Sequence, residues 1–364
     1  MSVARRRSRS SRRRRPNCPR SRAWWRRATT CLCGAAWRRI EQTGDWTSIF
    51  QTDLGDYLRE ADLALTSQDG SIQDFSEPYR CVDIVNLTSP PGAIEALEFA
   101  GIDGATVATN HIFDCGQTSG CGSRAFEQTL ELLDEAGIKT AGGGMNLEEA
   151  LEPAIFEVGD RTFGMLGFDD IAAGNPTFLG AEEDAPGTAP MDDSYDDEYA
   201  WNPNAAAFYA PAEMLETTRM ERTIREAKEE VDFLIVMINS GTEDSHDPGQ
   251  YTNRSIKGLR AAADAGADLV IGNQAHHVQA AEVRDGTFIG YALGNFVYDQ
   301  VHSVEHTQCY LAEASFWEDR LAAMRLLPCQ IHDYYQPRFV DEQTRLKILG
   351  DVWGAAANLP ASVE

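Results

Sequence analysis

The residue types most suited to chemistry lie in the stretch from Gly101 to Gly116. Here Asn110 and His111 directly follow a short apolar run, Gly104 to Ala108, which predicts a buried strand. Asp114 comes three residues after the histidine. Asn supplies a carbonyl oxygen and His an imidazole nitrogen, and both can bind a divalent metal or stabilise an oxyanion. A cap on the following helix is the competing interpretation, because Asn and Asp are common at helix starts.

The same arrangement recurs along the chain, since four predicted buried strands each end in a short polar cluster. Open α/β sheets carry their chemistry at the carboxyl ends of the strands, so neighbouring strands would bring these clusters to one edge. Carboxylate, amide oxygen and imidazole together are typical of a divalent metal site. The clusters contain Asp69, Asn110 with His111, Glu243, and His276 with His277, and a fifth strand end adds Asn295.

The elements that must position these clusters are read from apolar periodicity and from Gly and Pro. Alternating helices and strands predict an α/β fold. Two antiparallel pairs are expected, 154–158 with 162–167 and 309–316 with 321–327. Residues 172–211 are rich in Pro, Gly and Asp, and predict a long surface loop or lid. Helices are expected at 53–59, 92–100, 124–136, 214–230 and 254–265, and further strands at 61–65, 104–108, 231–238, 268–271 and 288–293.

Charge is divided unevenly along the chain. Residues 1–40 contain fourteen Arg and no Asp, Glu or Lys. The whole chain has 32 basic and 57 acidic residues, so residues 41–364 keep 18 basic against all 57 acidic ones, a net charge of −39. Such an acidic body argues against nucleic acid or an anionic membrane surface as its partner. No apolar run approaches the ~20 residues that a membrane helix needs.

The Arg-rich segment, residues 1–40, cannot bury enough apolar surface to fold alone and is expected to be disordered. A nucleic-acid-binding arm and a twin-Arg export signal remain open for it. Its apolar stretch, 28–37, is short and is followed by more Arg, so no convincing export signal is present. Cys115 and Cys121 flank a Gly/Ser-rich loop, and they would pair as a disulfide in an exported protein or otherwise remain loop thiols.

Six segments, in order along the chain, resemble the sequence motifs of one protein family. They are ADLALTSQDGSI (61–72), ATVATNHIFDCG (105–116), AGIKTAGGGMNLEEALEPAIFEV (136–158), GTE (241–243), AGADLVIGNQAHHVQ (265–279) and YALGNFVYDQ (291–300). In these segments the chain resembles the CapA family, named for poly-γ-glutamate capsule synthesis, which is similar in fold to the calcineurin-like metallophosphoesterases. The resemblance implies a two-sheet sandwich flanked by helices, a four-layer αββα domain over residues 41–340, followed by a C-terminal tail over 341–364.

The resemblance also implies an activity and a location. The expected protein is a metal-dependent hydrolase of a phosphoester or γ-glutamyl amide bond, in the cell envelope or outside the cell. Its substrate would be an anionic polymer or a phosphoester, and its cofactor at least one divalent ion of Mn, Mg, Zn or Fe. The implied roles are catalysis for His111 and Asp114, metal binding for Asp69, Asn110, Glu243 and His276, and substrate binding for Asn239, Asn273, His277 and Asn295.

The chain departs from the family pattern at three places. The family's opening strand, which ends in Gly-Asp, is not found, and this motivates the hypothesis that residues 1–40 are read from a shifted frame or a wrong start. The His of the family's His-x-Gly-x-Glu turn is Asn239 here, and the first His of its later pair is Asn273. A second metal would therefore be held poorly. The alternative to a hydrolase is a catalytically decayed envelope factor that binds or guides an anionic polymer.

Overall fold

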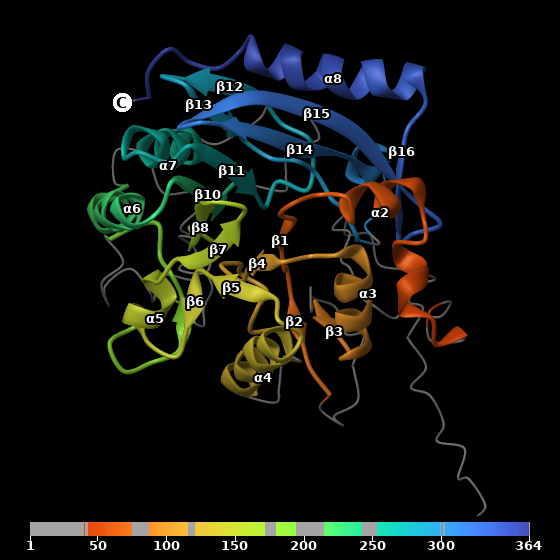
Figure 1. The fold of residues 1–364 in the computed structure, drawn as a ribbon, viewed down its shortest axis with the longest axis horizontal. Coiled ribbons are helices and arrows are strands. Elements are labelled where there is room, and N and C mark those ends of the chain that lie inside the picture. The colour runs from red at the N-terminus through yellow and green to blue at the C-terminus, as the bar shows by residue number, and fades with distance from the viewer. Residues whose placement is uncertain are drawn as a thin grey trace, which may run out of the picture.

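A six-stranded sheet forms the central layer of the computed structural model (Figure 1). The structure describes residues 40, 43–74, 87–115, 121–171, 180–193, 215–241, 253–298, 300 and 303–363. Four inner strands run parallel, and the two edge strands are antiparallel to their neighbours. In sheet order the strands are β12 (Ala281–Arg284), β13 (Thr287–Gly290), β11 (Leu269–Asn273), β10 (Phe233–Asn239), β8 (Arg161–Asp169) and β7 (Ala154–Val158).

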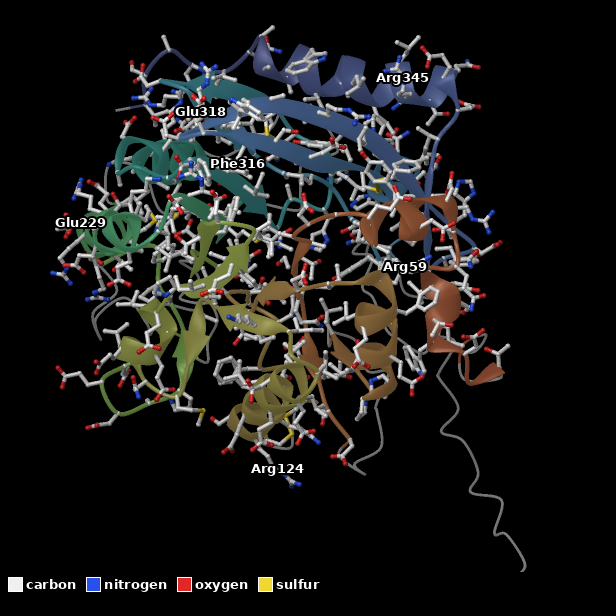
Figure 2. The ribbon with its side chains drawn as sticks, viewed as in Figure 1. Arg59, Arg124, Glu229, Phe316, Glu318 and Arg345 are labelled. Carbon is white, nitrogen blue, oxygen red and sulfur yellow. A yellow bond between two sulfur atoms is a disulfide. The ribbon has the colours of Figure 1, made fainter. Side chains whose placement is uncertain are left out.

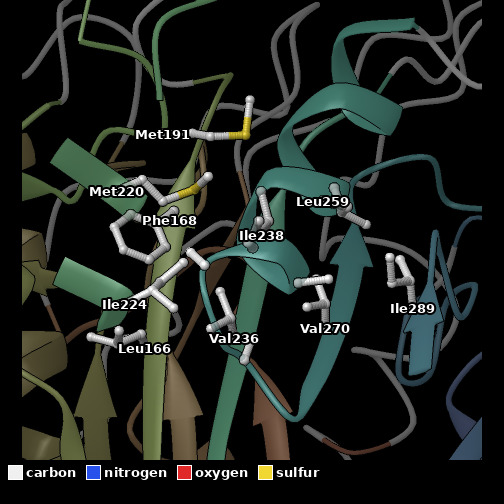
Figure 3. Packing of buried hydrophobic residues seen from close by; sticks show 14 of the residues in the cluster. Leu166, Phe168, Met191, Met220, Ile224, Val236, Ile238, Leu259, Val270 and Ile289 are labelled. Carbon is white, nitrogen blue, oxygen red and sulfur yellow. The ribbon is translucent and has the colours of Figure 1, made fainter. Parts of the chain in front are cut away.

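The central strand β10 shows why this sheet lies inside the protein. All seven of its residues, FLIVMIN, are buried. A parallel strand covered on both faces is expected to be apolar along its whole length, without alternation. One face of the sheet packs against the helices α6 (Thr218–Glu230) and α7 (Asn253–Asp264). Figure 3 shows this part of the core, where Ile224 of α6 and Leu259 of α7 lie over the strands.

A second sheet packs on the opposite face of the six-stranded sheet. It is antiparallel and consists of β14 (Gln308–Trp317), β15 (Arg320–His332) and β16 (Gln336–Phe339). Phe316 of β14 contacts the rings of Phe163 and Phe233 at centroid distances of 5.1 and 4.5 Å. Helix α8 (Glu342–Ala356) lies along β15 and β12, as Figure 1 shows. The layers are thus helix, sheet, sheet and helix, which confirms the predicted α/β sandwich.

A smaller parallel sheet approaches the end of the large one. It contains β1 (Leu65–Ser67), β4 (Gly104–Thr106) and β5 (Lys139–Ala141). Helices α3 (Gly92–Ala100) and α4 (Gly122–Glu135) supply much of its core. Gly167 of β8 permits the close approach, because a Cβ there would stand 2.2 Å from Thr106 Oγ1. The two sheets can therefore bring their strand ends together.

The remaining elements are short and lie around these layers. Figure 2 shows Glu229 of α6 and Arg345 of α8 on the outer surface of their helices. No helix among the described residues is long and apolar enough to cross a membrane. The short elements are η1 (Trp46–Ile49), α2 (Asp53–Leu58), β2 (Ser71–Ile72), β3 (Thr88–Ser89), β6 (Gly143–Gly144), α5 (Leu147–Leu151), β9 (Gly187–Thr188) and η5 (Glu305–Thr307).

Two expectations about the chain's irregular parts differ from the structure. Residues 180–193, placed by composition in a surface loop, contribute Ala189 and Met191 to the core beside α6 and α7. Residues 342–356, expected to belong to a tail, form α8, whose Ile348 is fully buried. Residues 1–39, 172–179 and 194–214 lie outside the described part of the chain.

Candidate functional site

Three polar residues stand side by side where the apolar strands of the large sheet end. Asn239 closes β10 and pairs in register with Asp169 of β8 on one side and with Asn273 of β11 on the other. These strands are parallel, so all three residues lie at the same carboxyl edge. This edge, together with the facing ends of β1 and β4, is called the rim below.

Two amide side chains join the smaller sheet to the large one at the rim. Asn239 Nδ2 donates to Asn110 Oδ1 at 3.0 Å and to Asp169 Oδ1 at 3.2 Å. Asn273 Nδ2 donates to Ser67 Oγ at 2.7 Å. The ends of β1, β4, β8, β10 and β11 therefore meet, but they do so across two sheets and not along the one sheet edge that the sequence predicted. Asn239 Oδ1 is buried and has no hydrogen-bond partner within the described part of the chain.

His111 and Asp114 form a pair next to this junction. The distance from His111 Nδ1 to Asp114 Oδ2 is 2.7 Å, and the Leu87 N–H donates to the same oxygen at 2.7 Å. Burial raises the pKa of Asp114, and the neighbouring imidazole acts against that rise. The oxygen that faces His111 is the one that accepts from the Leu87 N–H, so we assign the proton to His111 Nδ1 and the basic lone pair to Nε2.

His276 is oriented by a chain of hydrogen bonds behind it. Asn295 Nδ2 donates to Gln300 Oε1 at 2.9 Å and to the His306 carbonyl at 3.0 Å, which fixes the amide orientation. Its Oδ1 therefore accepts from His276 Nδ1 at 2.8 Å. This tautomer places the lone pair of His276 on Nε2, the form in which an imidazole binds a metal. The residue has φ +57°, a left-handed turn conformation.

A cavity of about 310 Å³ opens beside these residues. Its polar lining includes Asp69, Asn273, His276 and Asn295. Asp69 also lies close enough to Asp114 for its charge to raise the pKa of that carboxyl, although burial is the larger cause. The Oδ1 atom of Asp69 is buried and makes no hydrogen bond to the described residues. The apolar end is lined by aromatic and aliphatic side chains that include Trp46, Phe50, Leu58, Phe296 and Leu311.

Three predicted site residues remain to be placed, namely His277, Asn295 and Glu243. His277 is buried, with Nδ1 2.8 Å from the Ala275 carbonyl oxygen and its ring 3.9 Å from that of His306. Asn295 is also buried and lines the cavity beside His276. Glu243 lies outside the described residues.

The side chains around the rim include atoms of the kinds that bind a divalent ion. Two buried oxygen atoms without hydrogen-bond partners, on Asp69 and Asn239, and the imidazole of His276 are donors suited to a hard or borderline cation. Across the described ranges no group of three or more His, Cys, Asp or Glu could hold a metal. A two-ion centre needs several such charged or imidazole ligands.

The structure adds features around the rim that the sequence left open or did not show. Cys115 and Cys121 form a disulfide directly after Asp114, which decides between the two predicted alternatives. A second disulfide, Cys309–Cys329, joins β14 to β15. No spacing rule pointed to it, because cross-strand partners are known only once the register is known.

Residues 30–300 match the family model described as bacterial capsule synthesis protein PGA_cap. The chain belongs to this family. It is 27% identical over 228 residues to the PGA biosynthesis protein CapA of Bacillus subtilis (strain 168), covering 62% of this chain and 50% of that one. It is 24% identical over 216 residues to the capsule biosynthesis protein CapA of Bacillus anthracis, covering 59% and 45%. This PGA_cap chain spans about half the length of these curated relatives.

A solved structure of a hypothetical protein from Thermus thermophilus is similar to the PGA_cap chain at a TM-score of 0.44 and 14% identity, covering 79% of this chain and 94% of that one. The sequence resemblance to the CapA family is confirmed by the match to the family model and by the two named relatives. Sequence comparison therefore shows the family of the chain, and the geometry of the rim is described from the chain's own structure.

Proposed function

We propose that the chain is a metal-dependent hydrolase of capsule or poly-γ-glutamate biosynthesis that cleaves a phosphoester or γ-glutamyl amide bond. The observation that carries the proposal is the His111–Asp114 pair beside a rim of strand ends from two sheets. The pathway is taken from the family description and from the names of the two CapA relatives. A location in the cell envelope or outside the cell is part of this proposal.

His111 is the proposed catalytic residue. Its Nε2 would exchange a proton with the attacking water or the leaving group, and the charged ring would stabilise the developing oxyanion. Asp114 would act through His111, because its carboxylate keeps the proton on Nδ1 and favours the imidazolium form. The Leu87 N–H holds that carboxylate in place.

Four residues would hold the divalent ion, which is Mn, Mg, Zn or Fe in this proposal: Asp69, Asn110, Glu243 and His276. The ion, when bound, would polarise the phosphoryl or carbonyl oxygen and lower the pKa of a water. The buried oxygen of Asp69 and the Nε2 tautomer of His276 support this assignment. A bound cation would also offset the repulsion between an anionic substrate and an acidic protein.

The substrate would lie along the rim and in the cavity. Asn273 lines the cavity and would donate to the anionic oxygens of the substrate through its second amide hydrogen. Asn239 would act on the substrate only indirectly, because both hydrogens of its Nδ2 are donated to Asn110 and Asp169. Asn295 lines the cavity beside His276 and would both contact substrate and hold the His276 ring. His277 is buried and does not line the cavity, so it would support the turn that carries His276. The apolar end of the cavity leaves room for an uncharged part of the substrate.

The test is turnover of bis-p-nitrophenyl phosphate and of γ-glutamyl p-nitroanilide with added Mn²⁺. His111→Ala should lower the rate by about 10²–10⁴-fold, the usual contribution of a general acid or base. The matched control is His332→Ala, which changes an exposed histidine outside the cavity lining. No turnover with any divalent ion, or an equal loss in both variants, would refute the hydrolase.

A decayed envelope factor is the second candidate. It is favoured by Asn239 and Asn273 at positions where the family pattern has His, and by the lack of a metal-binding group among the described residues. An acidic protein would need a bridging cation to hold an anionic polymer, so polyglutamate binding should disappear with chelator and return with Mn²⁺. Polyglutamate binding that is unchanged by chelator would rule out this cation-dependent envelope factor.

A further inference from the structure

One arginine is buried directly behind the rim. Arg254, near the start of α7, is 2% exposed, and its carboxylate partners Asp170 and Asp192 are 1% and 2% exposed. Its Nε lies 2.8 and 2.9 Å from the two carboxylate oxygens of Asp170, and its Nη2 lies 2.6 Å from Oδ1. The same Nη2 donates to Asp192. A planar guanidinium that makes several bonds at once fixes orientation as well as distance.

Asp170 and Ser240 connect this buried group to the rim through the chain itself. Asp170 follows Asp169 at the end of β8, and Ser240 follows Asn239 at the end of β10. Ser240 Oγ donates to Asp170 Oδ2 at 3.1 Å, and the backbone N–H of Asp170 donates to the Asn239 carbonyl at 2.9 Å.

At the end of β8, Asp169 therefore faces the rim and the next residue, Asp170, binds Arg254. At the end of β10, Asn239 faces the rim and the next residue, Ser240, donates to Asp170. Successive side chains along an extended chain point to opposite sides, which explains this division. Burial raises the pKa of Asp170, and the guanidinium opposes that rise. Without Arg254, the buried carboxylate of Asp170 would lose the guanidinium that opposes this rise.

We propose that Arg254 is a positioning residue for the rim: through Asp170 and Ser240 it fixes the ends of β8 and β10, and so places the amide of Asn239 between Asn110 and Asp169. Only the expected effect on turnover rests on the proposed function. The expected effect on the position of the Asn239 amide holds whether or not the protein is a hydrolase.

Arg260 provides a matched control on the same helix. It is also largely buried and makes two bonds to one carboxylate, at 2.8 and 3.0 Å from Glu282. Glu282 belongs to the edge strand β12 and not to the strand ends at the rim. Breaking this second pair should lower stability without moving Asn239.

The experiment compares Arg254→Met, Arg254→Lys and Arg260→Met in the full chain. The side-chain amide signal of Asn239, assigned by its loss in Asn239→Asp, should shift in Arg254→Met, and Mn²⁺-dependent turnover should fall at least tenfold. Arg254→Lys should recover part of both, and Arg260→Met should change neither. An unmoved signal in folded Arg254→Met, or the same shift in Arg260→Met, would overturn the proposal.

A milder variant covers the case in which Arg254→Met does not fold. Asp170→Asn keeps the size of the side chain but removes the charge that the guanidinium binds. It should shift the Asn239 signal in the same direction by a smaller amount. An unchanged signal in folded Asp170→Asn would then reject the proposed route from Arg254 to the rim. If the signal shifts but no variant or wild-type protein shows turnover, the positioning role stands and the hydrolase fails.

Discussion

Replacing Asp114 separates the charge of its carboxylate from its hydrogen bonds. The Leu87 N–H and the His111 Nδ1–H both donate to the same oxygen, Oδ2, each at 2.7 Å. Asp114→Asn can place its amide oxygen there and keep both bonds, whereas Asp114→Ala keeps neither. Leu87 is buried, so its unpaired N–H alone should cost about 1–3 kcal/mol in Asp114→Ala. Burial raises the pKa of Asp114, so its charge does not stabilise the folded protein, and Asp114→Asn with both bonds kept should unfold within about 1 kcal/mol of wild type.

The assays are urea unfolding followed by circular dichroism and turnover with Mn²⁺. Asp114→Ala should show the larger loss in both, because it removes the carboxylate that holds the proton on His111 Nδ1. Asp114→Asn should unfold nearly as wild type and keep part of the activity. Equal unfolding free energies for the two variants would refute the reasoning, since it depends on the shared acceptor oxygen.

The pH dependence gives an independent check on the same residue. Burial raises the pKa of Asp114 above its ordinary value of 3.8, so the folded protein binds this proton more tightly than the unfolded chain does. Its contribution to stability is fully present below pH 3.8 and is lost as the pH rises through the raised value. As the pH falls, the unfolding free energy of wild type should therefore rise relative to that of Asp114→Asn.

Two further predictions concern the packing around the rim. Gly167→Ala should lower the unfolding free energy by about 1–3 kcal/mol, because its Cβ would collide with Thr106 Oγ1. Gly350→Ala in α8 is the control and should raise it by about 0.5–1 kcal/mol, since the helix gains Ala in open space. Replacing Cys115 and Cys121 by Ser should cost about 2 kcal/mol by the loop-entropy relation, measured by urea unfolding; no change would mean that the bridge is not formed in solution.

Local signals made much of the fold predictable. The helix over 92–100 ends as expected at Gly101, which adopts φ +74° as a left-handed C-cap. The hairpin of β7 and β8 and the pair of β14 and β15 also follow the alternation and turn residues of the sequence. Residues 180–193 were assigned to a loop because Pro, Gly and Asp dominate the composition, although Met191 packs in the core.

The rim was predictable as a set of strand ends but not as a set of contacts. The bond between Asn110 and Asn239 joins residues 129 positions apart, and its existence depends on how two sheets dock. Arg254 was read only as part of a helix, because a buried arginine has no local sequence signal. Its partners, Asp170 and Asp192, lie 84 and 62 positions away in the chain.

The close approach at Gly167 has a consequence for how this site can be inherited. The smaller sheet is built entirely from residues before 142, and the large sheet from residues after 153. A gene fragment ending between them would still encode His111 and Asp114. It would lack Asn239, Asn273 and every strand of the six-stranded sheet. Recombination at that boundary would join the smaller sheet of one protein to the large sheet of another, and the two would not have been selected to pack together. We therefore expect the gene segments for the two sheets to be inherited as one unit.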